Sequence, residues 1–126
     1  ASHIFTTVDK TDTDLEKMIL RQRMLMAIIK DVLMEKYGAR LVRNGDDLYD
    51  GDKKLSVSIA TLTPVSAMIH TGLNIVSKDT PVKTVGLKDL GIKDEEIEPL
   101  GNQICSRYSV EIEEINLARC KVRGTK

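Results

Sequence analysis

Arg43 to Val76 reads RNGDDLYDGDKKLSVSIATLTPVSAMIHTGLNIV, and this stretch decides the fold. Two tight-turn signals, Asn44-Gly45 and Asp50-Gly51-Asp52, separate short runs with strand character. Two longer runs follow, Leu55 to Thr61 and Met68 to Val76, and each alternates apolar with small or polar residues. The stretch therefore predicts a series of antiparallel strands joined by tight turns.

Each of the two longer strands has one apolar face and one face of small or polar residues. The small or polar faces comprise Lys54, Ser56, Ser58 and Ala60 in the first strand, and His70, Gly72 and Asn74 in the second. A glycine inside a strand often marks a place where a ligand or another backbone comes close. Together the two faces predict the floor of a pocket with Lys54 at its rim. The alternative is a solvent-exposed sheet face, which antiparallel sheets often have.

Helices and one more strand flank this centre. The pattern predicts a strand from His3 to Val8, a long helix from about Asp14 to Lys36 and one helical turn from Leu87 to Leu90. Asp94-Glu95-Glu96 reads as an acidic helix start, and from Leu100 to about Arg119 a helical stripe follows, made of Leu100, Ile104, Tyr108, Ile112 and Ile115, before a frayed tail over 121–126. Thr13 and Glu16 form a capping-box pattern at the start of the long helix, and Gly38 ends it. The methionines at 18, 24, 26 and 34 are predicted to fill the core, with a methionine-lined groove as the alternative. Strands grouped between helices predict a two-layer α+β fold, one mostly antiparallel, mixed sheet with helices packed on one face.

Composition limits the classes of function. Nineteen basic residues balance nineteen acidic ones, so no global field attracts nucleic acid or an anionic membrane. No apolar run approaches the roughly 18 residues that span a bilayer. Cys105 and Cys120 lack metal-ligand spacing, which predicts buried thiols in a reducing cytoplasm, with a disulfide as the alternative. We expect one domain over 1–126, without an N-terminal portion of the full-length protein.

Single residues carry weaker signals. Lys53 and Lys54 follow a turn, where lysines are usually solvated edge charges. Asp46 and Asp47 are usual turn formers, and they are also candidate Mg²⁺ ligands, since that ion binds carboxylates together with substrate phosphates. His70 is more often a structural hydrogen-bond partner than a catalyst. The chain has no G-x-S-x-G serine, Walker-type phosphate loop, G-x-G-x-x-G or His/Cys metal-ligand set.

The central stretch resembles the catalytic core of the biotin and lipoate protein ligases. Asp46-Asp47-Leu48-Tyr49, then Lys53-Lys54-Leu55-Ser56, then Gly72-Leu73-Asn74 match in order and spacing the N-D-L-Y, R-K-L-A-G or R-K-I-S-G, and G-x-N segments of those enzymes. The turn Gly86 to Gly91 also falls where that fold has a similar element. Arg43 to Val76 with Thr80-Pro81-Val82 is more closely similar to an uncharacterised, largely archaeal family of unknown function (number 366). That similarity covers nearly the whole chain and implies no known activity.

The ligase resemblance implies chemistry in which ATP activates a carboxylic acid as an adenylate and the acyl group passes to an amine. Lys54 matches the lysine that contacts the acid and the phosphate of the adenylate, and it is the implied catalytic residue; a fixed ammonium stabilises the negative charge that develops there. Asp46 and Asp47 fall near nucleotide and metal, and Gly72 and Asn74 on the strand that lines the ligand. The implied ligand-binding set is Arg43, Asp46, Asp47, Ser56, Ser58, His70, Gly72 and Asn74.

This chain departs from the ligases at several points. Asp46 stands where they have Asn, and Val57 stands where they have a glycine after the lysine segment. Their glycine- and arginine-rich ligand loop and the small C-terminal barrel of many members have no counterpart in this sequence. Three functions follow: an ATP-dependent ligase or transferase, a non-catalytic module for a small molecule or nucleotide, or a structural dimer joined through an unpaired sheet edge.

Overall fold

The computed structural model describes residues 2–9, 14–64, 66–76 and 83–124, with side-chain surroundings for 14–64, 66–76 and 83–120. Its elements are the strands β1 (Ser2–Asp9), β2 (Val42–Asn44), β3 (Asp47–Asp50), β4 (Lys53–Lys54), β5 (Ser56–Thr63) and β6 (Ser66–Asn74), the helices α1 (Leu15–Tyr37) and α2 (Asp94–Gly124), and the 3-10 turn η1 (Leu87–Leu90). The predicted α+β class is confirmed.

The strands form two antiparallel sheets of three, where the sequence predicted one. The long sheet has the order β1-β6-β5, and the small sheet has the order β2-β3-β4. The chain passes from one to the other at Leu55, between β4 and β5. One isolated parallel bridge, Lys54 to Thr84, adds the segment after residue 82 to the small sheet. The two tight turns occur as predicted, with Gly45 at φ 64° and Gly51 at φ 63°.

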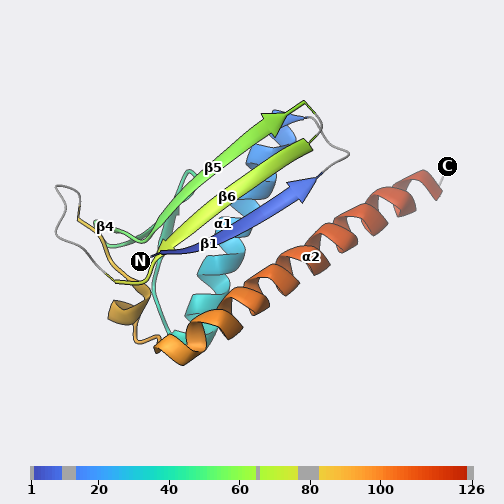
Figure 1. Cartoon of the computed structure of the whole chain (residues 1–126). Helices are drawn as coiled ribbons and strands as arrows, with labels where there is room; N and C mark the ends of the chain where they lie inside the picture. Colours follow the sequence, from blue (N-terminus) through green and yellow to red (C-terminus); the bar gives the residue numbers. More distant parts are fainter. Residues whose placement is uncertain (1, 10–13, 65, 77–82, 125–126) are drawn as a thin grey trace.

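Helix α1 covers one face of the long sheet (Figure 1). Asp14 caps its first turn by accepting a hydrogen bond from the backbone N–H of Lys17, and Gly38 ends it in the left-handed conformation. Thr13, the predicted cap, lies outside the described residues. Buried side chains from α1 and the sheets form the core, among them Met18, Met26, Ile29, Leu33, Leu48, Ile69 and Leu73.

Two predictions about packing are wrong. Met34 is 51% exposed because it lies on the solvent side of α1, so only part of the methionine set fills the core. Both cysteines are exposed on α2 and are free thiols, because the buried stripe of that helix runs through Leu100, Ile104 and Tyr108 and misses them.

Helix α2 begins at Asp94, at the acidic helix start that the sequence indicated, and it contains Pro99 in its second turn. Its start lies beside the end of α1, where the hydroxyl of Tyr37 donates to Glu96 Oε2 at 2.9 Å. It then runs diagonally past the sheet (Figure 1). The helix continues through residue 124, within the tail that was predicted to fray, and residues 125 and 126 lie outside the described residues.

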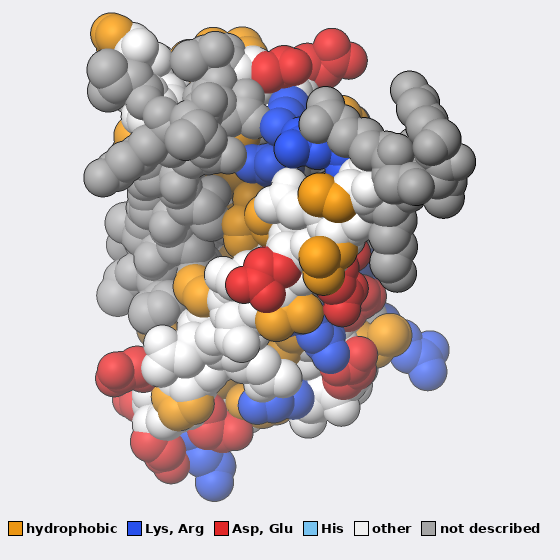
Figure 2. All heavy atoms as spheres, turned by 90° about the vertical axis from the view of Figure 1, so that its right-hand side faces the viewer, with side chains coloured by type: hydrophobic (Ala, Val, Ile, Leu, Met, Phe, Trp, Pro, Cys, Tyr) orange, Lys and Arg blue, Asp and Glu red, His pale blue; other side chains and the backbone are white. Residues whose placement is uncertain are grey.

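On the face of the molecule shown in Figure 2, hydrophobic, acidic and basic side chains of the described residues are interspersed. Part of the hydrophobic exposure in this structure comes from the second half of α2, where Val110, Ile115 and Leu117 are each at least 45% exposed. Ile115 was predicted to continue the buried stripe of the helix, and that prediction is wrong. Among the described residues no helix is long and apolar enough to cross a membrane.

Candidate functional site

Lys54 lies where the two sheets meet, and its backbone is held from three sides. It pairs with Tyr49 of β3. Its N–H donates to the carbonyl of Lys83 at 2.9 Å, and its own carbonyl accepts from the N–H of Val85 at 3.0 Å. The same carbonyl accepts a second hydrogen bond from Asn74 Nδ2 at 3.2 Å. The base of this side chain is therefore fixed by residues from β3, from β6 and from the segment before η1.

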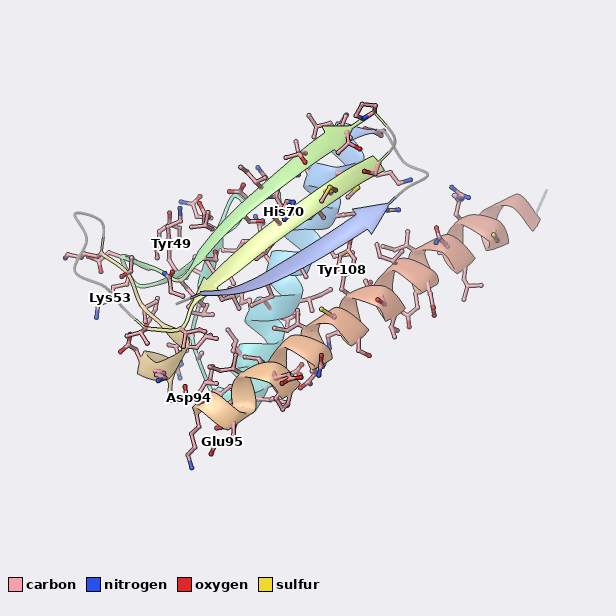
Figure 3. The ribbon with its side chains drawn as sticks, viewed as in Figure 1. Tyr49, Lys53, His70, Asp94, Glu95 and Tyr108 are labelled. Atoms are coloured by element: carbon pink, nitrogen blue, oxygen red, sulfur yellow. The ribbon has the colours of Figure 1, made fainter. Side chains whose placement is uncertain are left out.

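The ammonium group of Lys54 faces a carboxylate. Its Nζ lies 3.4 Å from Asp47 Oδ2, and the two side chains are 29% and 21% exposed. Register places Tyr49, Lys54 and Asp47 on one face of the small sheet, since cross-strand partners and alternate residues share a face. Figure 3 shows Tyr49 and Lys53 at this end of the molecule. This partly buried ion pair orients the ammonium, which stays accessible to an anionic ligand.

An exposed ion pair supports the neighbouring segment. Lys83 Nζ lies 2.8 Å from Asp52 Oδ2 in the turn between β3 and β4. The hydrogen bond and positive charge of Lys83 lower the pKa of Asp52, and the same contact raises the pKa of Lys83. Because both groups are exposed, solvent screens this pair and its effect on stability is small. Its position shows that the segment carrying Lys83 and the turn before Lys54 are joined at the surface as well.

The two predicted serines lie on the opposite face of the long sheet from His70 and Gly72. Ser56 is fully buried, and its Oγ accepts a hydrogen bond from the backbone N–H of Leu48 at 2.9 Å. Ser58 is also buried. The prediction that these serines share a pocket floor with His70 and Gly72 is wrong, because the serine-bearing face of β5 packs toward α1.

On the exposed face of the long sheet, β5 presents apolar side chains, whereas β6 presents a histidine and a glycine. Val57 is 61% exposed and lies opposite Gly72, and Ile59 is 56% exposed and lies opposite His70. His70 is exposed and lies midway along the sheet (Figure 3). An alanine Cβ at Gly72 would lie 3.9 Å from the carbonyl oxygen of Val57, which is an ordinary contact. Gly72 therefore leaves this part of the sheet face without a side chain, although packing does not require a glycine at this position.

The structure separates Asp46 from Asp47. Asp47 faces Lys54, whereas Asp46 Oδ2 accepts a hydrogen bond from Gln22 Nε2 of α1 at 3.2 Å. Within the described ranges no group of three His, Cys, Asp or Glu residues is placed to hold a metal ion. Arg43 is exposed and donates to the carbonyl of Gly45 at 2.6 Å, so its guanidinium closes the turn between β2 and β3.

Two features of the site were missed by sequence reasoning. Asn74 was assigned to ligand binding, yet its side-chain amide donates to Lys54 and positions that residue. Gln22 was assigned no role, although it is 2% exposed and links α1 to Asp46 and Ser58. A buried glutamine within an apolar helical stripe is the signal that could have identified it, because buried amides are almost always hydrogen-bonded.

Comparison with solved structures defines the class of fold. Biotin protein ligase from Aquifex aeolicus superposes with a TM-score of 0.73 at 16% identity, over 90% of this chain and 53% of the ligase. A putative lipoate protein ligase from T. acidophilum with bound lipoic acid gives a TM-score of 0.60 at 12% identity, over 85% of this chain and 51% of that one. The chain therefore has a fold that it shares with about half of each of these biotin and lipoate protein ligases.

Within that class, the chain belongs to the family described as Domain of unknown function (DUF366), whose model matches residues 2–123. An uncharacterised protein of Methanocaldococcus jannaschii is 50% identical over 103 residues, which are 81% of this chain and 45% of that protein. A protein of unknown function from Pyrococcus horikoshi superposes with a TM-score of 0.83 at 32% identity, over 94% of this chain and 62% of that one. The chain thus spans about half to two-thirds of these relatives, and the recognised family and fold are confirmed.

Proposed function

We propose that this chain carries the lysine of an adenylate-forming site, in which a carboxylic acid reacts with ATP. The observation that supports this most directly is the placement of Lys54. Its backbone is fixed by hydrogen bonds to Lys83, Val85 and Asn74, and its ammonium projects from the meeting point of the two sheets. A preorganised positive charge is most useful where negative charge develops, as it does when a carboxylate meets the α-phosphate of ATP.

The proposed reaction has two steps. A carboxylate oxygen attacks the α-phosphorus of ATP, the bond to the bridging oxygen breaks, and pyrophosphate leaves with the electron pair. An amine then attacks the acyl carbon, loses a proton and expels AMP, which leaves an amide. Lys54 would stabilise the phosphate oxygens in the first step, with Mg²⁺ bound to the phosphates and Asp47 as the neighbouring carboxylate.

The ligands that we propose for this chain are taken from solved proteins of the same fold. A biotin protein ligase from Aquifex aeolicus has been solved in complex with biotin and ATP, and it superposes with a TM-score of 0.70 at 16% identity. We propose a carboxylic acid whose apolar part lies on the exposed face near Gly72 and Val57. Because this chain spans about half of that ligase, residues outside it would complete the ligand site.

Thermal melts with a matched pair of lysine variants test the proposal. The chain is melted alone, with Mg²⁺ and ATP, and with a panel of non-hydrolysable acyl-adenylate analogues, as wild type, Lys54→Ala and Lys53→Ala. Lys53 is exposed and has the same charge, so it controls for loss of one cation. A ligand at 100 times its dissociation constant adds about 2.7 kcal/mol to the free energy of unfolding, which is a clear shift in the midpoint.

We expect the shift to vanish in Lys54→Ala and to persist in Lys53→Ala. Pyrophosphate release in the presence of a carboxylic acid then distinguishes an enzyme from a binding module. Equal shifts in the two variants would place the nucleotide elsewhere. Absence of any shift, with a relative of full length behaving in the same way, would leave a non-catalytic role as the function of this fold.

The second candidate function, a homodimer, is favoured by β5. This strand is terminal in the long sheet, carries no charged residue from Ser56 to Thr63, and exposes Val57 and Ile59. Such an edge is a template for pairing with another strand. We expect sedimentation to give a dimer that Val57→Lys weakens; a wild-type monomer at all concentrations would refute it.

A reducing cytoplasm, the location we propose, suits the two free, exposed thiols.

A further inference from the structure

A cleft of about 300 Å³ lies at the outer edge of the long sheet, on the side of α1. It is lined by Ile19, Gln22 and Arg23 of α1, by Asp46 of the β2–β3 turn and by Ile59 and Ala60 of β5. The volume is at the lower end of the range found for small-molecule pockets. Its walls combine an apolar surface with one amide, one carboxylate and one guanidinium, and none of these groups belongs to the ion pair of Lys54.

A chain of hydrogen bonds fixes the orientation of the Gln22 amide. The Thr71 hydroxyl donates to Met26 Sδ at 4.0 Å, so the hydroxyl of Ser58 supplies the hydrogen in its 2.9 Å contact with Thr71. Ser58 Oγ is then an acceptor for Gln22, whose Nε2 lies 2.9 Å away. A hydroxyl has only one hydrogen to give, which is why Gln22 must present its NH₂ group here.

The other hydrogen of the same NH₂ group is directed to Asp46 Oδ2, at 3.2 Å. Both donors of Gln22 are thereby used, and the side chain is only 2% exposed. Within the described part of the chain, its carbonyl oxygen Oε1 receives no hydrogen bond. A buried acceptor without a donor is uncommon in native proteins. In a residue that lines a cleft, it indicates a ligand with an N–H or O–H group.

Two residues of opposite charge in the cleft, Arg23 and Asp46, make no ion pair with any described residue. Among the described residues Asp46 has one contact, the hydrogen bond from Gln22, and Arg23 has no ion pair. The two side chains line the same cleft but do not pair with each other. A carboxylate and a guanidinium thus line one cleft without pairing, and Ile19, Ile59 and Ala60 form its apolar wall.

We infer that this cleft binds a small aliphatic amino acid or a similar zwitterion. The ammonium group of the ligand donates to Asp46 and to Gln22 Oε1, which are acceptors only in this arrangement. The carboxylate of the ligand meets Arg23, whose guanidinium matches carboxylate geometry. The aliphatic side chain packs on Ile19, Ile59 and Ala60.

The test measures binding of three probes of similar shape to the 126-residue chain. These are L-leucine, isoamylamine, which keeps only the ammonium, and 4-methylvalerate, which keeps only the carboxylate. Calorimetry gives dissociation constants, and amide chemical shifts locate the site. Asp46→Asn and Arg23→Gln remove one charge each, Arg40→Gln is the matched control for an exposed arginine outside the cleft, and Lys54→Ala controls for the proposed adenylate site.

We expect L-leucine to bind with shifts at the cleft residues, and isoamylamine and 4-methylvalerate to bind at least about tenfold more weakly, since each loses a charge-assisted contact. Asp46→Asn and Arg23→Gln should weaken L-leucine by a similar factor, while Arg40→Gln and Lys54→Ala leave it unchanged. The inference fails if no probe gives saturable shifts at the cleft, if isoamylamine equals L-leucine, or if Lys54→Ala abolishes binding. Different variants therefore test this inference and the proposed adenylate site, so the failure of one can be distinguished from the failure of the other.

Discussion

Replacing Gly86 by alanine tests how closely the chain after β6 packs against the segment that leads into η1. An ideal Cβ at Gly86 would lie 2.5 Å from the carbonyl oxygen of Ile75, 2.7 Å from its carbonyl carbon and 2.8 Å from that of Val76. The backbone at Gly86 has φ −112° and ψ 165°, which any L-residue can adopt. The expected effect is therefore steric alone, with no contribution from a special backbone conformation.

The neighbouring atoms have little freedom to move. All three are backbone atoms, and the carbonyl of Ile75 also accepts a hydrogen bond from the N–H of Lys88 at 3.0 Å. Insertion of a methyl group into a packed site costs about 1–3 kcal/mol, and we expect a value near 3 kcal/mol because no flexible side chain can yield. For a domain of this size that corresponds to a fall in melting temperature of about 10 °C.

Urea denaturation of the wild type, Gly86→Ala and Gly72→Ala measures the effect. Gly72 is the matched control, because its added Cβ would meet only the carbonyl oxygen of Val57 at 3.9 Å. Gly72→Ala should remain within about 1 kcal/mol of the wild type, the usual cost of changing a residue's propensity in a strand. Equal stability of Gly86→Ala and the wild type, with unchanged denaturant slope, would refute the close approach of these two segments.

Three further predictions follow from individual contacts. Ser56→Ala should lower the free energy of unfolding by about 1–3 kcal/mol in urea, since the buried N–H of Leu48 loses its acceptor. The pKa of Glu96 is lowered by hydrogen bonds from the backbone N–H of Lys93 and then from Tyr37, so this carboxylate stabilises the fold above its unfolded-state pKa and ceases to do so as the pH falls through the lower folded-state value. Tyr37→Phe should make melting temperature depend less steeply on pH in that acidic range, and an unchanged slope would contradict the contact. Both cysteines are exposed, so a thiol reagent should modify two thiols per folded chain without denaturant, and a lag until unfolding would contradict their placement.

The sequence was sufficient for the turns and the fold class because local chemistry decides them. Gly38, Gly45 and Gly51 all have positive φ, and each ends a helix or makes a tight turn where the sequence placed one. The alternation in β5 was also correct. The prediction that the serine face of β5 is open was wrong, because hydrogen bonds with Gln22 and Leu48 satisfy the two serine hydroxyls inside, and no pattern within the strand carries that information.

The sequence identified the region of the candidate site but not the contacts that its side chains make. The resemblance assigned Lys54, Asp46 and Asp47 to one ligand site, whereas the structure places Asp47 3.4 Å from Lys54 and bonds Asp46 to Gln22. It did not reveal that Asn74 donates to the carbonyl of Lys54 or that the segment after residue 82 bonds to both sides of that residue. These contacts join parts of the chain far apart in sequence, so spacing and periodicity cannot encode them.

The three-sided support of the Lys54 backbone has a consequence for motion. The Lys54 amide hydrogen is bonded to the carbonyl of Lys83, and it can exchange with deuterium only when that segment separates from β4. The ammonium of the same residue lies four carbons away from this backbone and remains 29% exposed with its side chain. Slow amide exchange and rapid access of solvent to the Nζ are thus expected in a single residue. Solvent therefore reaches the ammonium without any opening of the structure, while the peptide that carries it moves only with the segments bonded to it.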